Sequence, residues 1–189
     1  MRNLVKGIRR FWRDRRGSLL VETGMMISVL SLVALGGLEV ARYTLLHQKL
    51  ERIAASIGDL VAQPATISNS DVVNIFDAIE QVAKPFEMGP NGRVIVSSIG
   101  ATGGSGPILN WQRTSPGSLS ATSHIGTIEG QPATLPGGLT IVDGETIIVA
   151  EVFYNYTPWI YDGVVGNPAI YHTAFFRPRL GTLTVIDPN

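Results

Sequence analysis

The sequence predicts an α+β protein in which a long N-terminal transmembrane helix continues into a small domain, where a second helix packs on an antiparallel β-sheet. Three observations predict this fold. A mainly apolar run occupies residues 19–40, apolar residues then recur at helical spacing as far as Pro64, and the pattern later changes to the alternation that is typical of strands. The expected divisions are a basic leader at 1–17, the long helix at 18–63 and an extracytoplasmic domain at 64–189.

Charge is distributed unevenly along the 189 residues, although the formal net charge is zero. Residues 1–16 hold seven of the 15 Lys and Arg residues and one of the 15 Asp and Glu residues, so the rest of the chain has eight basic and 14 acidic residues. This acidic excess argues against nucleic-acid binding as the main task. The basic cluster instead indicates membrane topology with the N-terminus in the cytoplasm, and its members include Arg9, Arg10, Arg13, Arg15 and Arg16.

The run at 19–40 reads LLVETGMMISVLSLVALGGLEV and predicts a membrane span. As a helix it would rise about 33 Å, enough to cross a hydrocarbon core of about 30 Å. A hydrophobic content of 44% and a mean hydropathy of +0.20 agree with contact with lipid. A cleavable secretory signal is the alternative, but cuts after Ala34 or Ala41 would place Leu32 or Glu39 three positions back, where a small residue is expected.

Helical spacing continues past the membrane surface and predicts one helix of about 45 residues. Its apolar stripe has two possible partners, the chain's own domain or another subunit. The residues of the stripe are Leu46, Leu50, Ile53, Ile57 and Leu60.

The domain at 64–189 begins with a second helix, which Ser68, Asn69, Ser70 and Asp71 can cap and which ends before Pro85. Its apolar face is expected to comprise Val72, Phe76, Ile79 and Ala83. Strands are predicted at 92–99, 107–113, 145–157, 169–177 and 180–186, the first two joined as a hairpin across 100–106. Residues 115–140, rich in Gly, Ser, Thr and Pro, predict a flexible surface excursion.

Alternation within 145–157 divides the strand into two faces. One face is wholly apolar or aromatic, comprising Ile148, Ala150, Val152, Tyr154 and Tyr156, and predicts a core. The aromatic residues nearby could instead form a stacking platform, for which Trp159 and Tyr161 are the expected exposed contacts.

No pattern points to an enzyme, a cofactor or a metal. The chain has no cysteine, and His47, His124 and His172 lack ligand spacing, so surface or half-buried positions are expected. The GGSGP stretch at 103–107 lacks the features of a nucleophile elbow or a phosphate-binding loop and predicts a turn. Asp143 and Glu145 could supply oxygens to calcium, but two acids at the start of a strand are far more often part of a solvated turn.

Glu22 lies inside the apolar run, where an ionised carboxylate costs about 2.5–3.5 kcal/mol at the bilayer centre. Two explanations are open. Glu22 lies within two turns of Arg15 and Arg16 and could reach the headgroup layer. If the chain were cut after Gly17, the new α-ammonium of Ser18 would lie one helical turn from Glu22, or be supplied by a neighbouring subunit, and would offset the charge.

The basic leader that ends in Gly17, followed by SLLVE at 18–22, resembles the class III signal of type IV pilins and pseudopilins. In that family a dedicated prepilin peptidase removes the leader. The segments LGGLEVARY at 35–43 and QKLERIAA at 48–55 resemble the membrane-exit segment of TadE-like proteins of the tight-adherence (Tad, or Flp) pilus system. The segments VAEVFYNYTP at 149–158 and AFFRPR at 174–179 resemble the paired strands of the same family.

The resemblance covers residues 15–62 and 145–180 and leaves 64–140 unaccounted for. It implies a pilin-type helix and a minor pseudopilin of the TadE, TadF or TadG kind, in which Gly17 and Ser18 are the processing pair and Glu22 is the assembly residue. Thr23 stands where the family often has Tyr or Phe.

The implied partners are the membrane, prepilin peptidase, other minor pseudopilins, the major Flp pilin and the inner-membrane assembly platform. The implied location is the bacterial inner membrane, single-pass with a periplasmic C-terminal domain, with or without incorporation into an extracellular pilus. The alternative function is an uncleaved, membrane-anchored periplasmic binding module. An anchored hydrolase is a third, for which the sequence nominates no residue.

Overall fold

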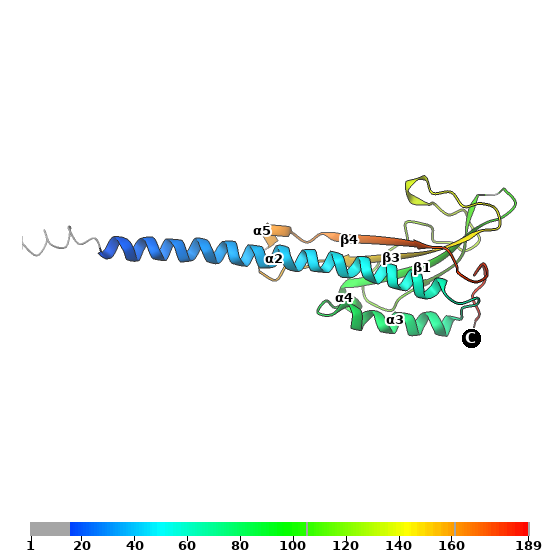
Figure 1. Ribbon diagram of the computed structural model, residues 1–189, viewed down its shortest axis with the longest axis horizontal. Coiled ribbons are helices and arrows are strands. Elements are labelled where there is room, and N and C mark those ends of the chain that lie inside the picture. Colours follow the sequence, from blue (N-terminus) through cyan, green and yellow to red (C-terminus); the bar gives the residue numbers. More distant parts are fainter. Residues whose placement is uncertain (1–15, 105, 161, 189) are drawn as a thin grey trace, which may run out of the picture.

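The computed structural model of the chain describes residues 16–104, 106–160 and 162–188. Its main helices are α2 (Arg16–Ala62) and α3 (Asn69–Ala83). Four antiparallel strands form one sheet in the order β2-β1-β3-β4, made of β1 (Gly92–Ala101), β2 (Pro107–Thr114), β3 (Thr146–Asn155) and β4 (Ala169–Phe176). Three short pieces complete the fold: α4 (Met88–Asn91), η1 (Pro136–Gly138) and α5 (Asp162–Val165). The predicted α+β class is confirmed (Figure 1).

Helix α2 runs for 47 residues and divides into two halves (Figure 1). The N-terminal half projects beyond the domain, whereas the C-terminal half lies along β3 and β4. Of the predicted apolar stripe, Leu46, Leu50, Ile53 and Ile57 are buried in the chain's own domain, but Leu60 is 45% exposed. The stripe therefore packs on this domain, and Leu60 does not belong to it.

Helix α2 approaches β4 closely at Gly58. A Cβ atom added there would lie 2.5 Å from Cδ2 of Phe176 and 3.6 Å from Cβ of Ala150. Glycine at this position lets the helix backbone rest directly on the sheet, although it costs helix propensity.

Helix α3 begins at the predicted cap. The Ser68 hydroxyl accepts a hydrogen bond from the Asp71 N–H, and the Asp71 carboxylate accepts one from the Ser68 N–H, which together form a capping box. These hydrogen bonds hold the pKa of Asp71 below its ordinary value. The predicted apolar face is confirmed, since Val72, Phe76, Ile79 and Ala83 are all buried.

The helices cover one face of the sheet and enclose the larger core. The predicted inward face of β3 is confirmed, because Ile148, Ala150, Val152, Tyr154 and the following Tyr156 are buried there. Alternation along each strand places every second residue on this face, so the same core takes side chains from all four strands and both main helices.

The loop after β2 covers the opposite face, and it differs from a simple surface excursion. Ile125 and Ala133 from residues 115–140 are buried with Leu109, Ile147 and Val149 in a second, smaller core. Backbone hydrogen bonds from Leu109 to Gln131, and from Ala133 to Pro107, fix the loop along β2. A sheet with apolar residues on both faces requires cover on both, and this irregular segment provides the second layer.

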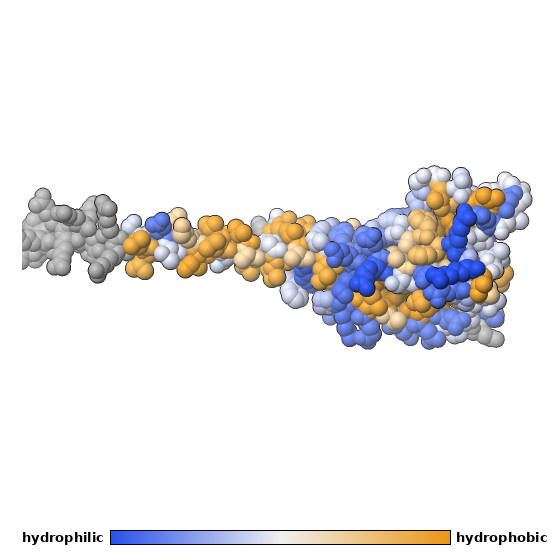
Figure 2. All heavy atoms as spheres, in the orientation of Figure 1, coloured by the Kyte–Doolittle hydropathy of each residue, from blue (hydrophilic) through white to orange (hydrophobic). Residues whose placement is uncertain are grey.

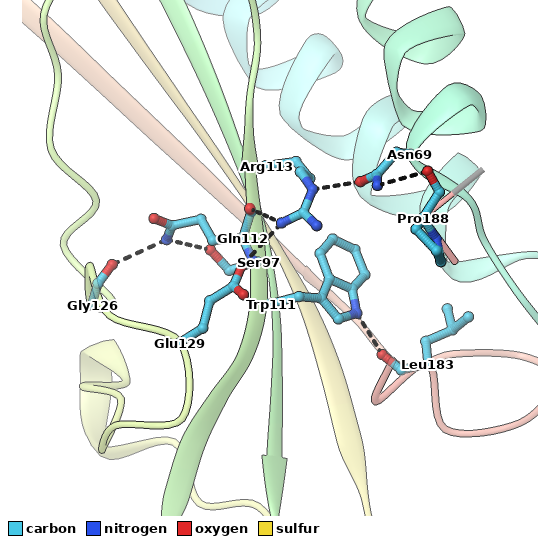
Figure 3. A network of polar contacts seen from close by, with 9 residues as sticks. All are labelled: Asn69, Ser97, Trp111, Gln112, Arg113, Gly126, Glu129, Leu183 and Pro188. Atoms are coloured by element: carbon cyan, nitrogen blue, oxygen red, sulfur yellow. Dashed lines mark hydrogen bonds and ion pairs between the residues drawn. The ribbon is translucent and has the colours of Figure 1, made fainter. Parts of the chain in front are cut away.

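The predicted strand at 180–186 is wrong. Gly181 and Leu183 have positive φ angles of 73° and 46°, which interrupt an extended conformation. This segment instead closes the end of the larger core, where the Leu183 carbonyl accepts a hydrogen bond of 2.8 Å from Trp111 Nε1 (Figure 3). The same carbonyl accepts a second hydrogen bond of 2.8 Å from Ser98 Oγ. Strand-like pairing occurs just after this segment, where Asp187 forms an isolated β-bridge with Ser68.

Near its C-terminal end, β2 makes polar contacts with β1, α3 and the loop that follows it (Figure 3). Arg113 donates to Asn69 at the start of α3 and forms an ion pair of 2.9 Å with Glu129 from the covering loop. Gln112 donates to Ser97 on β1 and to the Gly126 carbonyl of the same loop. One strand end thereby joins the helical layer to the irregular layer.

Candidate functional site

The N-terminal half of α2 is a bare apolar rod (Figure 2). In the described part of the chain, α2 is the one helix long and apolar enough to cross a membrane, with a mean hydropathy of 2.0 in its most apolar stretch, none of which is buried. Its exposed large apolar residues are Leu19, Leu20, Val21, Met25, Met26, Ile27, Val29, Leu30, Leu32, Val33, Leu35, Leu38 and Val40. Such a surface needs lipid or other helices to cover it.

The predicted processing and assembly residues lie at the start of this rod. Gly17 and Ser18 occupy the first turn of α2, and both are exposed. Glu22 follows one turn later, is also exposed, and makes no hydrogen bond or ion pair with any described residue. Of the predicted topology residues, Arg9, Arg10, Arg13 and Arg15 lie outside the described residues, and Arg16 is the first residue of α2. The carboxylate of Glu22 is therefore available to a partner.

A second carboxylate in α2, that of Glu39, is buried where the rod meets the domain. Glu39 is 1% exposed and accepts hydrogen bonds from the Tyr156 hydroxyl and from the backbone N–H groups of Trp159 and Ile160, the latter two at 3.2 Å. Burial, and then the neighbouring carboxylate, raise the pKa of Tyr156 to about 12, so the phenol keeps its proton and donates it to Glu39. These hydrogen bonds to Glu39 hold the β3–β4 connection against α2.

Arg42 lies one turn beyond Glu39 and holds an aromatic cluster. Its guanidinium carbon lies 4.0 Å from the centre of the Trp159 ring, 5.3 Å from that of Phe86 and 5.7 Å from that of Tyr156. Cation–π contacts of this kind are worth about 0.5–2 kcal/mol, depending on desolvation. The predicted division among the aromatics holds for the described residues, since Tyr154 and Tyr156 are buried while Trp159 is 72% exposed; Tyr161 lies outside the described residues.

Two histidines that the sequence separates by 125 positions meet between α2 and β4. Nδ1 of His47 lies 3.0 Å from Nε2 of His172, and the Tyr43 ring packs edge-on against His47. Nε2 of His47 is buried without a hydrogen-bond partner among the described residues. Burial first, and then the nearby His47, lower the pKa of His172 below its ordinary 6.5, while Glu51 opposes this shift.

A second buried carboxylate, that of Glu151 in β3, holds the loop that covers the other face of the sheet. It is fully buried and accepts hydrogen bonds from the Ser123 hydroxyl, the His124 N–H and the Tyr171 hydroxyl. Beside it lies a hollow of about 490 Å³, lined by residues 119–124, 153–155 and 169–171. The exposed His124 ring packs at its wall against Phe153 and Tyr171.

The remaining sequence candidates have structural roles. Gly103, Gly104 and Gly106 adopt positive φ angles in the β1–β2 turn, where the Gly104 N–H donates to Asp143. Glu145 forms an ion pair of 3.1 Å with Arg177. Among the described residues, no three His, Cys, Asp or Glu side chains are grouped so that they could hold a metal ion.

Sequence reasoning missed Glu39, the His47–His172 pair and Glu151 as contact centres. Their partners are contributed by segments more than 100 positions away for Glu39 and His47, so no local spacing could reveal them. The one available signal was the presence of carboxylates at 39 and 151 within otherwise apolar elements, because a buried carboxylate requires donors.

Comparisons with protein-family models, with curated proteins and with solved structures find no match to this chain. Its function is therefore inferred from the residues and the geometry described above.

Replacing Glu39 by Gln is expected to loosen the β3–β4 connection. The amide offers one acceptor oxygen, and its NH₂ group would face the N–H donors of Trp159 and Ile160, a loss of about 1–3 kcal/mol. Hydrogen exchange at those two amides should become faster, while Glu87→Gln, an exposed change on the same side of the domain, should leave it unaltered. Unchanged exchange in Glu39→Gln would show that the carboxylate does not hold the segment.

The histidine pair predicts a loss of domain stability in acid. Because the pKa of His172 is lowered in the folded state, the unfolded chain binds the proton more readily, so stability is complete above about pH 6.5 and falls as the pH drops below that value. Denaturant midpoints measured from about pH 7.5 to about pH 5 should fall less steeply in His172→Gln than in the unmodified chain. The control is His124→Gln, which should retain the original slope; equal slopes in all three proteins would contradict the assignment.

Proposed function

We propose that this protein is a minor pseudopilin of a Tad-type pilus machine, processed after Gly17 and inserted in the inner membrane, where it initiates or assists pilus assembly. The observation that carries the proposal is the placement of Glu22, an exposed carboxylate without a partner among the described residues, one turn after Ser18 in the mainly apolar half of α2. A structural carboxylate would have donors within the chain, as Glu39 has. Glu22 is therefore suited to a partner outside the folded domain.

The mechanism that we propose is the pairing of two charges in lipid. Cleavage before Ser18 would create an α-ammonium, and an ammonium within reach of the Glu22 carboxylate lowers the cost of keeping both charges in the apolar phase. When the ammonium comes from one subunit and the carboxylate from the next, the contact also fixes the axial position of neighbouring helices. The bare half of α2 supplies the lateral surface, and its small residues at 24, 28, 31, 36 and 37 allow close helix approach.

The division of α2 supports this role. The C-terminal half packs within the domain, because its apolar stripe is buried in the chain's own core. The N-terminal half remains uncovered, so a subunit can pack through it without disturbing the domain. The domain would then lie in the periplasm, or on the pilus surface if the subunit enters the filament.

An uncleaved, membrane-anchored periplasmic binding module is the second candidate. The hollow beside Glu151, with its wall of His124, Phe153 and Tyr171, favours it because aromatic walls with a few polar groups are common in ligand sites. The two candidates differ in the fate of the N-terminus.

Leader removal is the first test. Intact-mass measurement of protein extracted from membranes should give a chain that begins at Ser18 when prepilin peptidase is present and at Met1 when the peptidase is absent. Gly17→Leu should block the cut, whereas Gly24→Leu, further along the same helix, should leave it intact. A chain that begins at Met1 in cells with active peptidase would refute the pseudopilin proposal and support the anchored module.

Replacing Glu22 by Ala tests the assembly role. The variant should still insert in the membrane, because removing a charge makes insertion easier, but the number of pili counted by electron microscopy should fall about tenfold or more. Ser28→Ala on the same helix serves as the control, since its hydroxyl bonds only the Gly24 carbonyl of its own helix. Normal piliation in Glu22→Ala would remove the proposed role of the carboxylate.

A further inference from the structure

The connection between β3 and β4 does not turn back at the end of the sheet. Residues 157–160 and 162–165 extend beyond the strands along α2, toward its bare half, and α5 lies against the helix there (Figure 1). Glu39 holds the first part of this segment through the N–H groups of Trp159 and Ile160. The segment is therefore fixed to the helix at one defined level, that of Glu39.

This segment, which we call the membrane-proximal loop (residues 157–160 and 162–165), exposes large apolar side chains. Trp159 is 72% exposed, Val164 46% and Ile160 40%. The neighbouring positions Leu35, Leu38 and Val40 of α2 are exposed by about the same fractions. Apolar surface thus continues from the rod onto the near end of the domain (Figure 2).

The length of the span places this loop at the edge of a bilayer. A helix needs about 20 residues to cross a hydrocarbon core of about 30 Å. A span that starts at Leu19 therefore ends beside Glu39, the residue to which the loop is tied. The exposed Trp159 then lies at the level of the lipid headgroups, where Trp is favoured because its ring is apolar and its N–H is polar.

We propose that the membrane-proximal loop docks into the headgroup layer of the same membrane that α2 crosses, with Trp159 as the interfacial anchor. The proposal rests on the membrane insertion of α2 contained in the proposed function. Its consequence is an orientation: the domain is held at a fixed height and rotation relative to the bilayer while the subunit waits for assembly.

The chemistry of the loop favours a lipid surface over a charged partner. Residues 157–165 contain no Lys or Arg and one acid, Asp162, so attraction to anionic groups does not drive the contact. Arg42 is engaged by the rings of Trp159, Tyr156 and Phe86, and it presents the Trp159 indole in a fixed position. Docking is therefore expected to depend on apolar burial and to be insensitive to salt.

Site-directed spin labelling of the full chain in phosphatidylethanolamine and phosphatidylglycerol vesicles tests the proposal. The native sequence has no cysteine, so each introduced thiol is the sole labelling site. Labels would be placed at Ile160→Cys and Val164→Cys in the loop, at Leu30→Cys in the span and at Val185→Cys, a 77% exposed position outside the loop. Collision with oxygen and with a water-soluble nickel chelate then reports whether each label lies in lipid or in water.

We expect the labels at 160 and 164 to be reached by oxygen several-fold more than by the nickel chelate, with the label at 30 deeper and the label at 185 fully aqueous. Adding Trp159→Ser should shift the label at 164 toward water, and raising the salt concentration should not. If the label at 30 lies in lipid while the labels at 160 and 164 are as aqueous as the label at 185, docking of the loop is refuted, whereas membrane insertion of α2 is supported.

Two other outcomes are equally decisive. If the label at 30 is also aqueous, membrane insertion fails, and with it both the docking and the proposed function. If the labels at 160 and 164 are immobile and shielded from both reagents, a protein surface covers the loop, and the lipid assignment is overturned in favour of contact between chains.

Discussion

The buried carboxylate of Glu39 is the constraint on which the arrangement of this protein depends. A carboxylate removed from water requires hydrogen-bond donors, and three converge on Glu39 from a segment that follows it by nearly 120 positions. That contact joins the long helix to the far end of the sheet at the place where the helix leaves the domain. It also sets where the bare half of α2 begins, and so separates the surface used for folding from the surface left for partners.

Glu39 and Glu151 solve the same physical problem in two places. Each is buried in an otherwise apolar element, and each is satisfied by a tyrosine hydroxyl together with backbone N–H donors from an irregular segment. Irregular segments have backbone donors that no ladder uses, which makes them suitable partners for a buried acid. Glu39 fixes the membrane-proximal loop to α2, and Glu151 fixes the loop at 115–140 to the second face of the sheet. Glu22 lacks such donors in the described chain, and this difference supports its proposed intermolecular role.

Helix α2 carries a surface buried in the domain along its C-terminal half and an exposed apolar surface along its N-terminal half. Beyond Glu39, α2 is part of a packed core that includes α3 and all four strands, and Gly58 lets the helix pack directly against Phe176. Before Glu39, the described part of the chain leaves the large apolar side chains of the helix exposed. A subunit built in this way can exchange lipid for neighbouring helices without unfolding its domain, as the proposed pseudopilin role requires.

Local pattern in the sequence was enough to determine the long helix, the α3 cap at Ser68, the four strands and the inward face of β3, because helix and strand periods and capping residues act within a few positions. It also singled out Glu22 as an acid within an apolar run. Only the tertiary structure decided that residues 180–186 turn rather than pair, that Ile125 and Ala133 form a second core, and that His47 meets His172. The donors of Glu39 were likewise decided there, because chain segments distant in sequence become neighbours through packing, and no spacing along the chain encodes that proximity.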